Sequence, residues 1–213
     1  MERIYVREWS WGYIVEHWVR VIAITVLTLT GTYIHWPFIS GGPEGFIMAW
    51  MRFFHFVAAY ALVLGLLVRV YMAFRSTFDR DWMDFSVIKN LGNVPDILGY
   101  YLFIKKSHKD YRKYNPLQAL AYLVVAVVIV FTALTGAALY QGNIFGFIPA
   151  QASFRWVNAL LGGESYTRIW HILAMWFFIV FVLIHVYMSV LATFVNRDRT
   201  ISSIFTGYKL KSR

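Results

Sequence analysis

The sequence contains no cysteine, so it cannot form disulfides, ligate an iron–sulfur cluster or perform thiol catalysis. Charged residues are also scarce, at 15% of the 213 residues, whereas 59% of the residues are hydrophobic. This composition is too apolar for a soluble domain of this length and predicts a membrane protein. The aromatic share of 19%, with nine Trp, is typical of helices whose ends lie among lipid headgroups.

Low-complexity segments and a recognisable second domain are absent as well, so we expect one integral-membrane domain over residues 1–213. The first apolar run follows the charged and aromatic segment MERIYVREWSWGY, and no small-residue cleavage site comes after it. We therefore expect a retained span and not a cleaved signal peptide. One weak internal similarity links LTLTGTYI (27–34) with TALTGAALY (132–140).

Four apolar runs are long enough to cross a bilayer, which takes about 20 residues of helix. They are too long for strands, and at this length only helices satisfy their own backbone in lipid. The sequence therefore predicts an all-α membrane four-helix bundle. Its four transmembrane helices are expected at about 14–38, 51–74, 117–140 and 169–195.

The distribution of charge predicts how these spans are oriented. The loop at 75–116 is rich in Lys and Arg, whereas the loops at 39–50 and 141–168 contain only Arg155 and Arg168. The positive-inside rule places both termini and the 75–116 loop in the cytoplasm of a chain that crosses the cell inner membrane several times. The net charge of +9 is thus explained by topology among membrane lipids, and we expect no nucleic-acid partner.

Two histidines interrupt the fourth apolar run, and a histidine in hydrocarbon needs a partner for its ring nitrogens. His171 and His185 are fourteen residues apart, which is about 40° short of four full turns and about 21 Å along a helix. The expected orientation places His55 at the depth of His171, and His17 at the depth of His185. Two stacked histidine pairs in a four-helix bundle are the ligand set that two b-type haems need.

Small residues agree with this interpretation. Gly31 follows His17 by fourteen residues, so it lies on the same helix face at the outer depth, where it leaves room for a flat porphyrin. Gly136, in the matching Leu-Thr-Gly of the third span, is placed to do the same. Close packing between membrane helices is an equally good explanation for Gly136.

Three alternatives to this histidine set remain. A single histidine in the membrane often only hydrogen-bonds to a neighbouring helix. A zinc site would cluster its ligands at one depth, with Cys or carboxylates among them. His35 follows His17 by eighteen residues, which is five whole turns, so it also faces inward at the outer depth, and geometry favours His55 over it only slightly.

Several segments closely resemble the b-type cytochrome subunit of membrane-bound uptake nickel–iron hydrogenases. These segments are RFFHF (52–56), LLVRVYMAF (66–74), NPLQA (115–119), RIWH…IHVYM (168–188) and GYK (207–209). A weaker similarity extends to the cytochrome subunit of respiratory formate dehydrogenase, which shares a Tyr-Asn-x-x-Gln pattern that is Tyr114, Asn115 and Gln118 here.

The resemblance implies a membrane anchor for the small and large hydrogenase subunits on the outer face. Such subunits hold two haems b and pass electrons to a quinone, and they catalyse nothing alone. The implied axial ligands are His17, His55, His171 and His185, which selects His55 over His35. The same scaffold in another dehydrogenase complex, such as formate dehydrogenase, is one alternative function, and a haem-free anchor or transporter is another.

Three arginines are candidates for contacts with haem propionates. Arg52 and Arg168 each precede an outer histidine by three residues, but interfacial anchoring explains them equally well. Arg20 follows His17 and can serve the inner haem or pair with Glu16 at i,i+4. Many members of the family resembled here have a basic residue shortly before the first ligand, and this chain has Glu16 there.

A quinone near the cytoplasmic face needs a hydrogen-bond donor and a source of protons. Asn115, Glu16 and Gln118 are the candidates that the sequence places there. Asn115 is followed by Pro116, so it is equally well suited to cap the third helix.

The expected topology can be tested with a reporter enzyme that is active only in the periplasm. Because loop 75–116 is basic, a reporter fused after Arg80 is expected to be inactive, and one fused near Gly163 is expected to be active. The reverse pattern would invert the orientation of all four spans.

Overall fold

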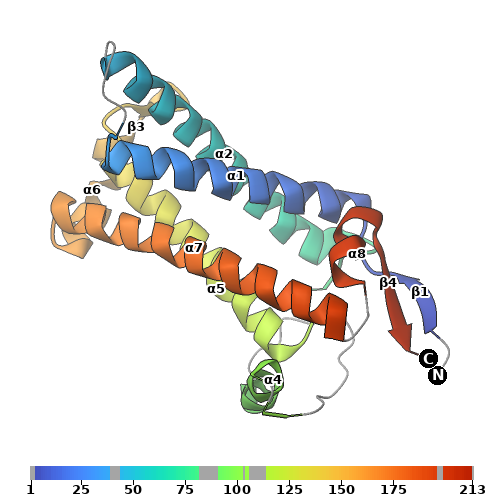
Figure 1. Cartoon of the computed structure of the whole chain (residues 1–213). Helices are drawn as coiled ribbons and strands as arrows, with labels where there is room; N and C mark the ends of the chain where they lie inside the picture. Colours follow the sequence, from blue (N-terminus) through green and yellow to red (C-terminus); the bar gives the residue numbers. More distant parts are fainter. Residues whose placement is uncertain are drawn as a thin grey trace. The chain divides into compact units, whose positions relative to one another are not determined.

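The computed structural model describes residues 3–38, 44–81, 91–102, 104–105, 114–195 and 199–212. Four long helices dominate it (Figure 1), and they are α1 (Trp11–His35), α2 (Glu44–Arg75), α5 (Pro116–Leu139) and α7 (Glu164–Val195). Each is long and apolar enough to cross a membrane, which confirms the predicted all-α fold with four transmembrane helices. Part of the basic loop, residues 82–90, 103 and 106–113, lies outside the described residues.

The helix boundaries differ from the predicted ones mainly at two starts. Helix α2 begins seven residues before the predicted start, and α7 begins five residues before it. The extra residues of α7, such as Glu164, are mostly polar or charged, and a search for apolar runs leaves them out, whereas residues 46–50 of α2 are apolar. The turn into α7 contains Gly162 and Gly163 at φ 90° and 115°, a left-handed conformation that favours glycine.

Short elements fill the connections. They are β1 (Arg3–Arg7), the 3-10 turn η2 (Leu91–Asn93), α4 (Val94–Tyr101), β2 (Asn143–Ile144), β3 (Ile148–Pro149), α6 (Ala150–Leu161), α8 (Thr200–Thr206) and β4 (Tyr208–Ser212). Strands β2 and β3 form a small antiparallel pair that leads into α6.

The chain forms two compact units, and each contains parts of all four long helices. Unit 1 comprises Met1–Trp18, Leu67–Ala126 and Leu183–Arg213, and unit 2 comprises Val19–Leu66 and Val127–Val182. Most large apolar side chains on the long helices are exposed, and only 6% of the most apolar stretch of α7 is buried. Such a surface suits hydrocarbon and not water.

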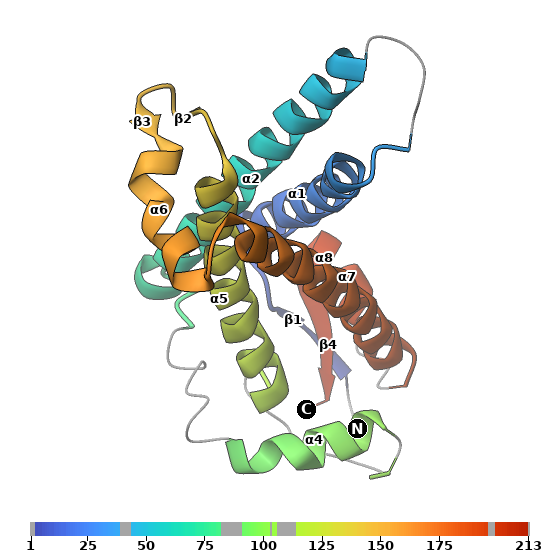
Figure 2. The ribbon, with the colours of Figure 1, turned by 90° about the vertical axis from the view of Figure 1, so that its left-hand side faces the viewer.

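Within unit 1 the two ends of the chain pair with one another. Strands β1 and β4 run antiparallel side by side, with Arg7 opposite Tyr208 and Arg3 opposite Ser212 (Figures 1 and 2). The pairing continues where the backbone N–H of Glu8 donates to the carbonyl oxygen of Gly207 at 2.8 Å. Both termini therefore lie on one side of the membrane, as an even number of spans requires, and the cytoplasmic assignment of that side stays a prediction.

Candidate functional site

In unit 2, His55 on α2 faces His171 on α7, with ring centroids 6.4 Å apart and ring planes inclined by 57°. His35, the competitor of His55, is exposed at the end of α1 and stacks edge-on against Trp36. The structure thus places His55, and not His35, opposite His171.

Each ring of this pair is held by a buried threonine. The distance from Thr30 Oγ1 to His55 Nδ1 is 2.9 Å, and Thr135 Oγ1 is 2.9 Å from His171 Nδ1. Each threonine hydroxyl already donates its only proton to a backbone carbonyl in the preceding turn, that of Val26 or of Phe131. The threonine oxygen must therefore accept from Nδ1–H, which leaves the lone pair of each histidine on Nε2.

The glycines that follow these threonines give the rings room. A Cβ atom on Gly31 would lie 3.3 Å from Cε1 of His55, and one on Gly136 would lie 3.1 Å from Cε1 of His171. Both distances are tighter than an ordinary van der Waals contact, so a larger residue would displace the histidine. In each Thr-Gly pair the threonine orients a ring and the glycine allows its close approach.

In unit 1, His17 on α1 faces His185 on α7 in almost the same way. Their ring centroids are 6.3 Å apart, and the planes are inclined by 46°. His17 also contacts Trp18 edge-on. The structure therefore contains two histidine pairs, each with one member from α7, in the combinations that the sequence predicts.

Both distances fit one metal ion bound between the two rings. An imidazole nitrogen binds a metal at about 2 Å, so two ligands on opposite sides of an iron have ring centroids about 6 Å apart. Among the described residues no group of three or more His, Cys, Asp or Glu side chains could hold a metal ion. Pairs of imidazoles with no third His, Cys, Asp or Glu ligand suit haem iron and do not suit zinc, which takes four ligands.

The three arginines predicted to contact propionates differ in burial and in partners. Arg168 forms an exposed salt bridge with Glu164 at 3.1 Å within α7, and Arg52 is exposed on α2. Both are arrangements typical of interfacial residues. Arg20 is half-buried on α1, one turn after the buried Glu16.

The predicted quinone residues Asn115 and Gln118 form a reciprocal cap at the start of α5. The backbone N–H of Gln118 donates to Asn115 Oδ1 at 2.8 Å, and the backbone N–H of Asn115 donates to Gln118 Oε1 at 3.1 Å. With Pro116 as the first helical residue, this is a capping box. Asn115 is buried in unit 1, which also contains Glu16 and the His17–His185 pair.

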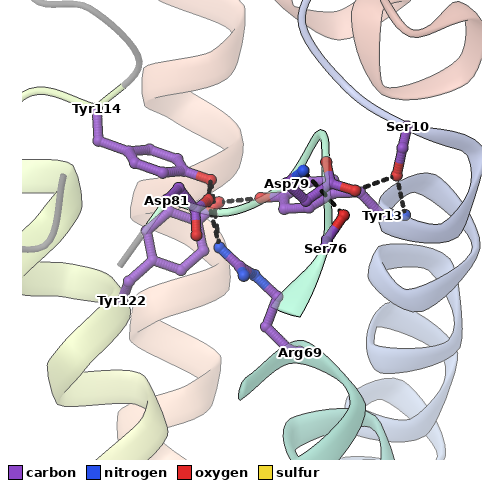
Figure 3. A network of polar contacts seen from close by, with 8 residues as sticks. All are labelled: Ser10, Tyr13, Arg69, Ser76, Asp79, Asp81, Tyr114 and Tyr122. Atoms are coloured by element: carbon purple, nitrogen blue, oxygen red, sulfur yellow. Dashed lines mark hydrogen bonds and ion pairs between the residues drawn. The ribbon is translucent and has the colours of Figure 1, made fainter. Parts of the chain in front are cut away.

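Sequence reasoning missed a buried polar cluster in unit 1 (Figure 3). Arg69 on α2 is 6% exposed and forms a 2.7 Å ion pair with Asp81, which is 1% exposed. Tyr114 donates to the same carboxylate oxygen at 2.9 Å. Burial raises the pKa of Tyr114 well above its ordinary value, so this hydroxyl keeps its proton. The missed signal was a lone arginine inside an apolar span, because such a residue is functional by default.

The cluster also contacts α1 and α5. The guanidinium of Arg69 lies 5.3 Å from the centre of the Tyr13 ring, and the hydroxyls of Tyr13 and Tyr122 are 2.5 Å apart. Beside it, Ser10 at the start of α1 donates to Asp79. Unit 1 therefore contains a buried cluster of charged groups and hydroxyls as well as its histidine pair, whereas threonine and glycine hold the pair of unit 2.

The chain is similar to known membrane cytochromes along most of its length. The model of the family described as prokaryotic cytochrome b561 matches residues 8–207, which include all four spans. The chain is 34% identical over 201 residues to the probable Ni/Fe-hydrogenase B-type cytochrome subunit of Azotobacter vinelandii, covering 91% of this chain and 84% of the relative. The Cupriavidus necator protein of the same name is 34% identical (91% and 82% covered). The probable Ni/Fe-hydrogenase 1 B-type cytochrome subunit of Escherichia coli K12 is 32% identical (91% and 86%).

The role of the threonine can be tested at Thr135. Thr135→Val removes the acceptor for His171 Nδ1–H with little change in volume, and loss of such a second partner lowers metal affinity by roughly 10–100-fold. We expect the Val variant to lose haem during detergent dilution, whereas the matched Thr135→Ser variant keeps it. Equal retention by the two variants in a pyridine haemochrome assay would show that the hydroxyl does not position the ligand.

Proposed function

The chain belongs to the prokaryotic cytochrome b561 family, and from that premise we propose that it carries electrons from a periplasmic nickel–iron hydrogenase through two haems b to the quinone pool. It is a multi-pass membrane protein and a b-type cytochrome, which implies haem b as its cofactor. In this proposal, residues 1–213 form a single di-haem domain.

The observation that carries the proposal is the pair of facing imidazoles present in each unit, at 6.4 and 6.3 Å. We propose His55 and His171 as the ligands of one haem, and His17 and His185 as the ligands of the other. When bound, haem supplies reversible one-electron chemistry at its iron. The protein supplies the ligands, fixes the tautomer of the unit 2 pair through Thr30 and Thr135, and excludes water.

The partner proposal rests on the names of the relatives. Those of Azotobacter vinelandii, Cupriavidus necator and Escherichia coli are all described as Ni/Fe-hydrogenase subunits, which favours a hydrogenase over a formate dehydrogenase as the electron donor. We propose that the small and large hydrogenase subunits dock on the outer loops, next to the unit 2 pair. Electrons then pass to the unit 1 pair and leave to a quinone near the basic side.

Haem stoichiometry tests the ligand assignment. Because each pair supplies two ligands to one iron, wild-type protein is expected to contain close to two haems b per chain, and His171→Ala or His185→Ala to contain one. His35→Ala, in which the exposed competitor is removed, is the matched control and is expected to keep both haems. Pyridine haemochrome assay of gently purified complex measures this directly.

Two outcomes would overturn the assignment. Full haem content in both the His171 and the His185 variants would exclude them as ligands. Loss of a haem in His35→Ala, together with full haem content in His55→Ala, would show that His35, and not His55, is the partner of His171.

Asn115 offers a test of the quinone site that separates hydrogen bonding from helix capping. Asp caps a helix as well as Asn does but lacks the amide N–H₂ donor, whereas Leu lacks both functions. If Asn115 donates to a quinone carbonyl, Asn115→Asp and Asn115→Leu are both expected to keep two haems and to slow reoxidation of the reduced haems. Stopped-flow spectra after mixing hydrogen-reduced complex with a soluble quinone analogue give the rate. Slow reoxidation in the Leu variant alone would leave Asn115 as only the cap of α5.

A further inference from the structure

A repeated spacing relates the two histidine pairs along the helices. On α7, His171 and His185 are fourteen residues apart, and on α1 Gly31 follows His17 by fourteen. Fourteen residues are close to four full turns, so the two members of each set lie on one helix face. In both helices one member belongs to unit 1 and the other to unit 2.

The other two long helices have the same spacing. On α2, Arg69 follows His55 by fourteen residues, and on α5, Tyr122 precedes Gly136 by fourteen. His55 and Gly136 line the unit 2 site. By the same helix geometry, Arg69 lies on the face of α2 that carries His55, and Tyr122 lies on the face of α5 that carries Gly136.

The contacts of Arg69 agree with that position. Its guanidinium lies over the ring of Tyr13, which precedes His17 by one helical turn on α1. The carboxylate of Asp81 at 2.7 Å and the hydroxyl of Tyr114, which donates to that carboxylate at 2.9 Å, hold the guanidinium in place. A fixed, buried cation therefore lies within unit 1 beside the turn that carries His17.

Haem b carries two propionate carboxylates, and a carboxylate buried in the membrane needs charge-assisted hydrogen bonds. Arginine is the side chain best suited to this task, because it stays charged and presents a rigid fork of donors. We propose that Arg69, held by Asp81 and Tyr114, binds a propionate of the haem at the His17–His185 pair and raises the reduction potential of that haem. This proposal rests on the proposed function.

The sign of the effect follows from electrostatics. Reduction adds one electron to the ferric iron, so a nearby cation stabilises the reduced form and a nearby anion destabilises it. A unit charge about 12 Å from a redox centre, at an effective dielectric constant of ~20, changes the reduction equilibrium about tenfold. For one electron, tenfold corresponds to about 59 mV. Loss of Arg69 must lower the potential, and loss of the charge on Asp81 must raise it.

The test is a redox titration of the purified complex, followed by visible spectra. The haem that disappears in His185→Ala identifies the signal of the unit 1 site. We expect Arg69→Gln to lower the reduction potential of this haem by about 59 mV, which corresponds to a tenfold change in the reduction equilibrium. Asp81→Asn is expected to raise the potential. Arg69→Lys is expected to change the reduction equilibrium by less than about threefold. The signal of the His55–His171 haem is expected to be unchanged in all three. Arg75→Gln removes an exposed charge from the same helix and is the matched control, with neither signal moved.

The alternative to this proposal is that the Arg69–Asp81 ion pair only holds the segment at Asp81 against α2. This structural role predicts different results. Shifts of the same sign in Arg69→Gln and Asp81→Asn, or unchanged potentials with full haem content in both, would overturn the proposal. If Arg69→Gln fails to assemble, Arg69→Lys and Asp81→Asn decide the question, and loss of both haems in Arg69→Lys would also contradict it. Wild-type protein with fewer than two haems would instead overturn the proposed function itself.

Discussion

Every polar group inside a membrane must find a partner within the protein, because hydrocarbon offers none, and this constraint governs both candidate sites. In unit 2, the hydroxyls of Thr30 and Thr135 each donate to their own helix backbone and accept from a histidine on another helix. One small side chain thus satisfies a ring nitrogen and selects the tautomer. The remaining nitrogen of each ring has its lone pair directed away from that partner, which is the state needed by a metal ligand.

The Thr-Gly dipeptides explain why the internal sequence similarity exists. Helices α1 and α5 contain the matching Leu-Thr-Gly segments, and each serves a histidine on a different helix, His55 or His171. Glycine at 31 or 136 leaves room for the imidazole, where a Cβ would lie 3.3 or 3.1 Å from the ring. The similarity therefore reflects one local solution, used twice, for holding a ring against a membrane helix.

The parts of the structure that follow from helix periodicity could be predicted from sequence. The four spans, the pairing of His17 with His185 and the choice of glycine at position 31 all depend on regular helix geometry. Spacing alone does not predict the threonine–histidine bonds, because a threonine in a membrane helix can satisfy its hydroxyl on its own backbone. The Arg69–Asp81 pair joins a helix to an irregular segment, and neither periodicity nor charge bias specifies such a contact. Asn115 shows the reverse case, because its capping role was visible in Asn-Pro-Leu-Gln itself.

The buried ion pair of unit 1 is not explained by stability alone. Removing two charges from water costs several kcal/mol per ion, and a well-packed apolar pair of similar volume is often as stable or more stable. The side chains of Arg69 and Asp81 are only 7% and 1% exposed. Their 2.7 Å contact and the hydrogen bond from the Tyr114 hydroxyl to Asp81 offset this desolvation cost. Unit 2 shows that the same four helices can hold a facing histidine pair with threonine and glycine instead. The buried charges of unit 1 therefore point to a task that uncharged residues cannot perform, and binding an anionic group is such a task.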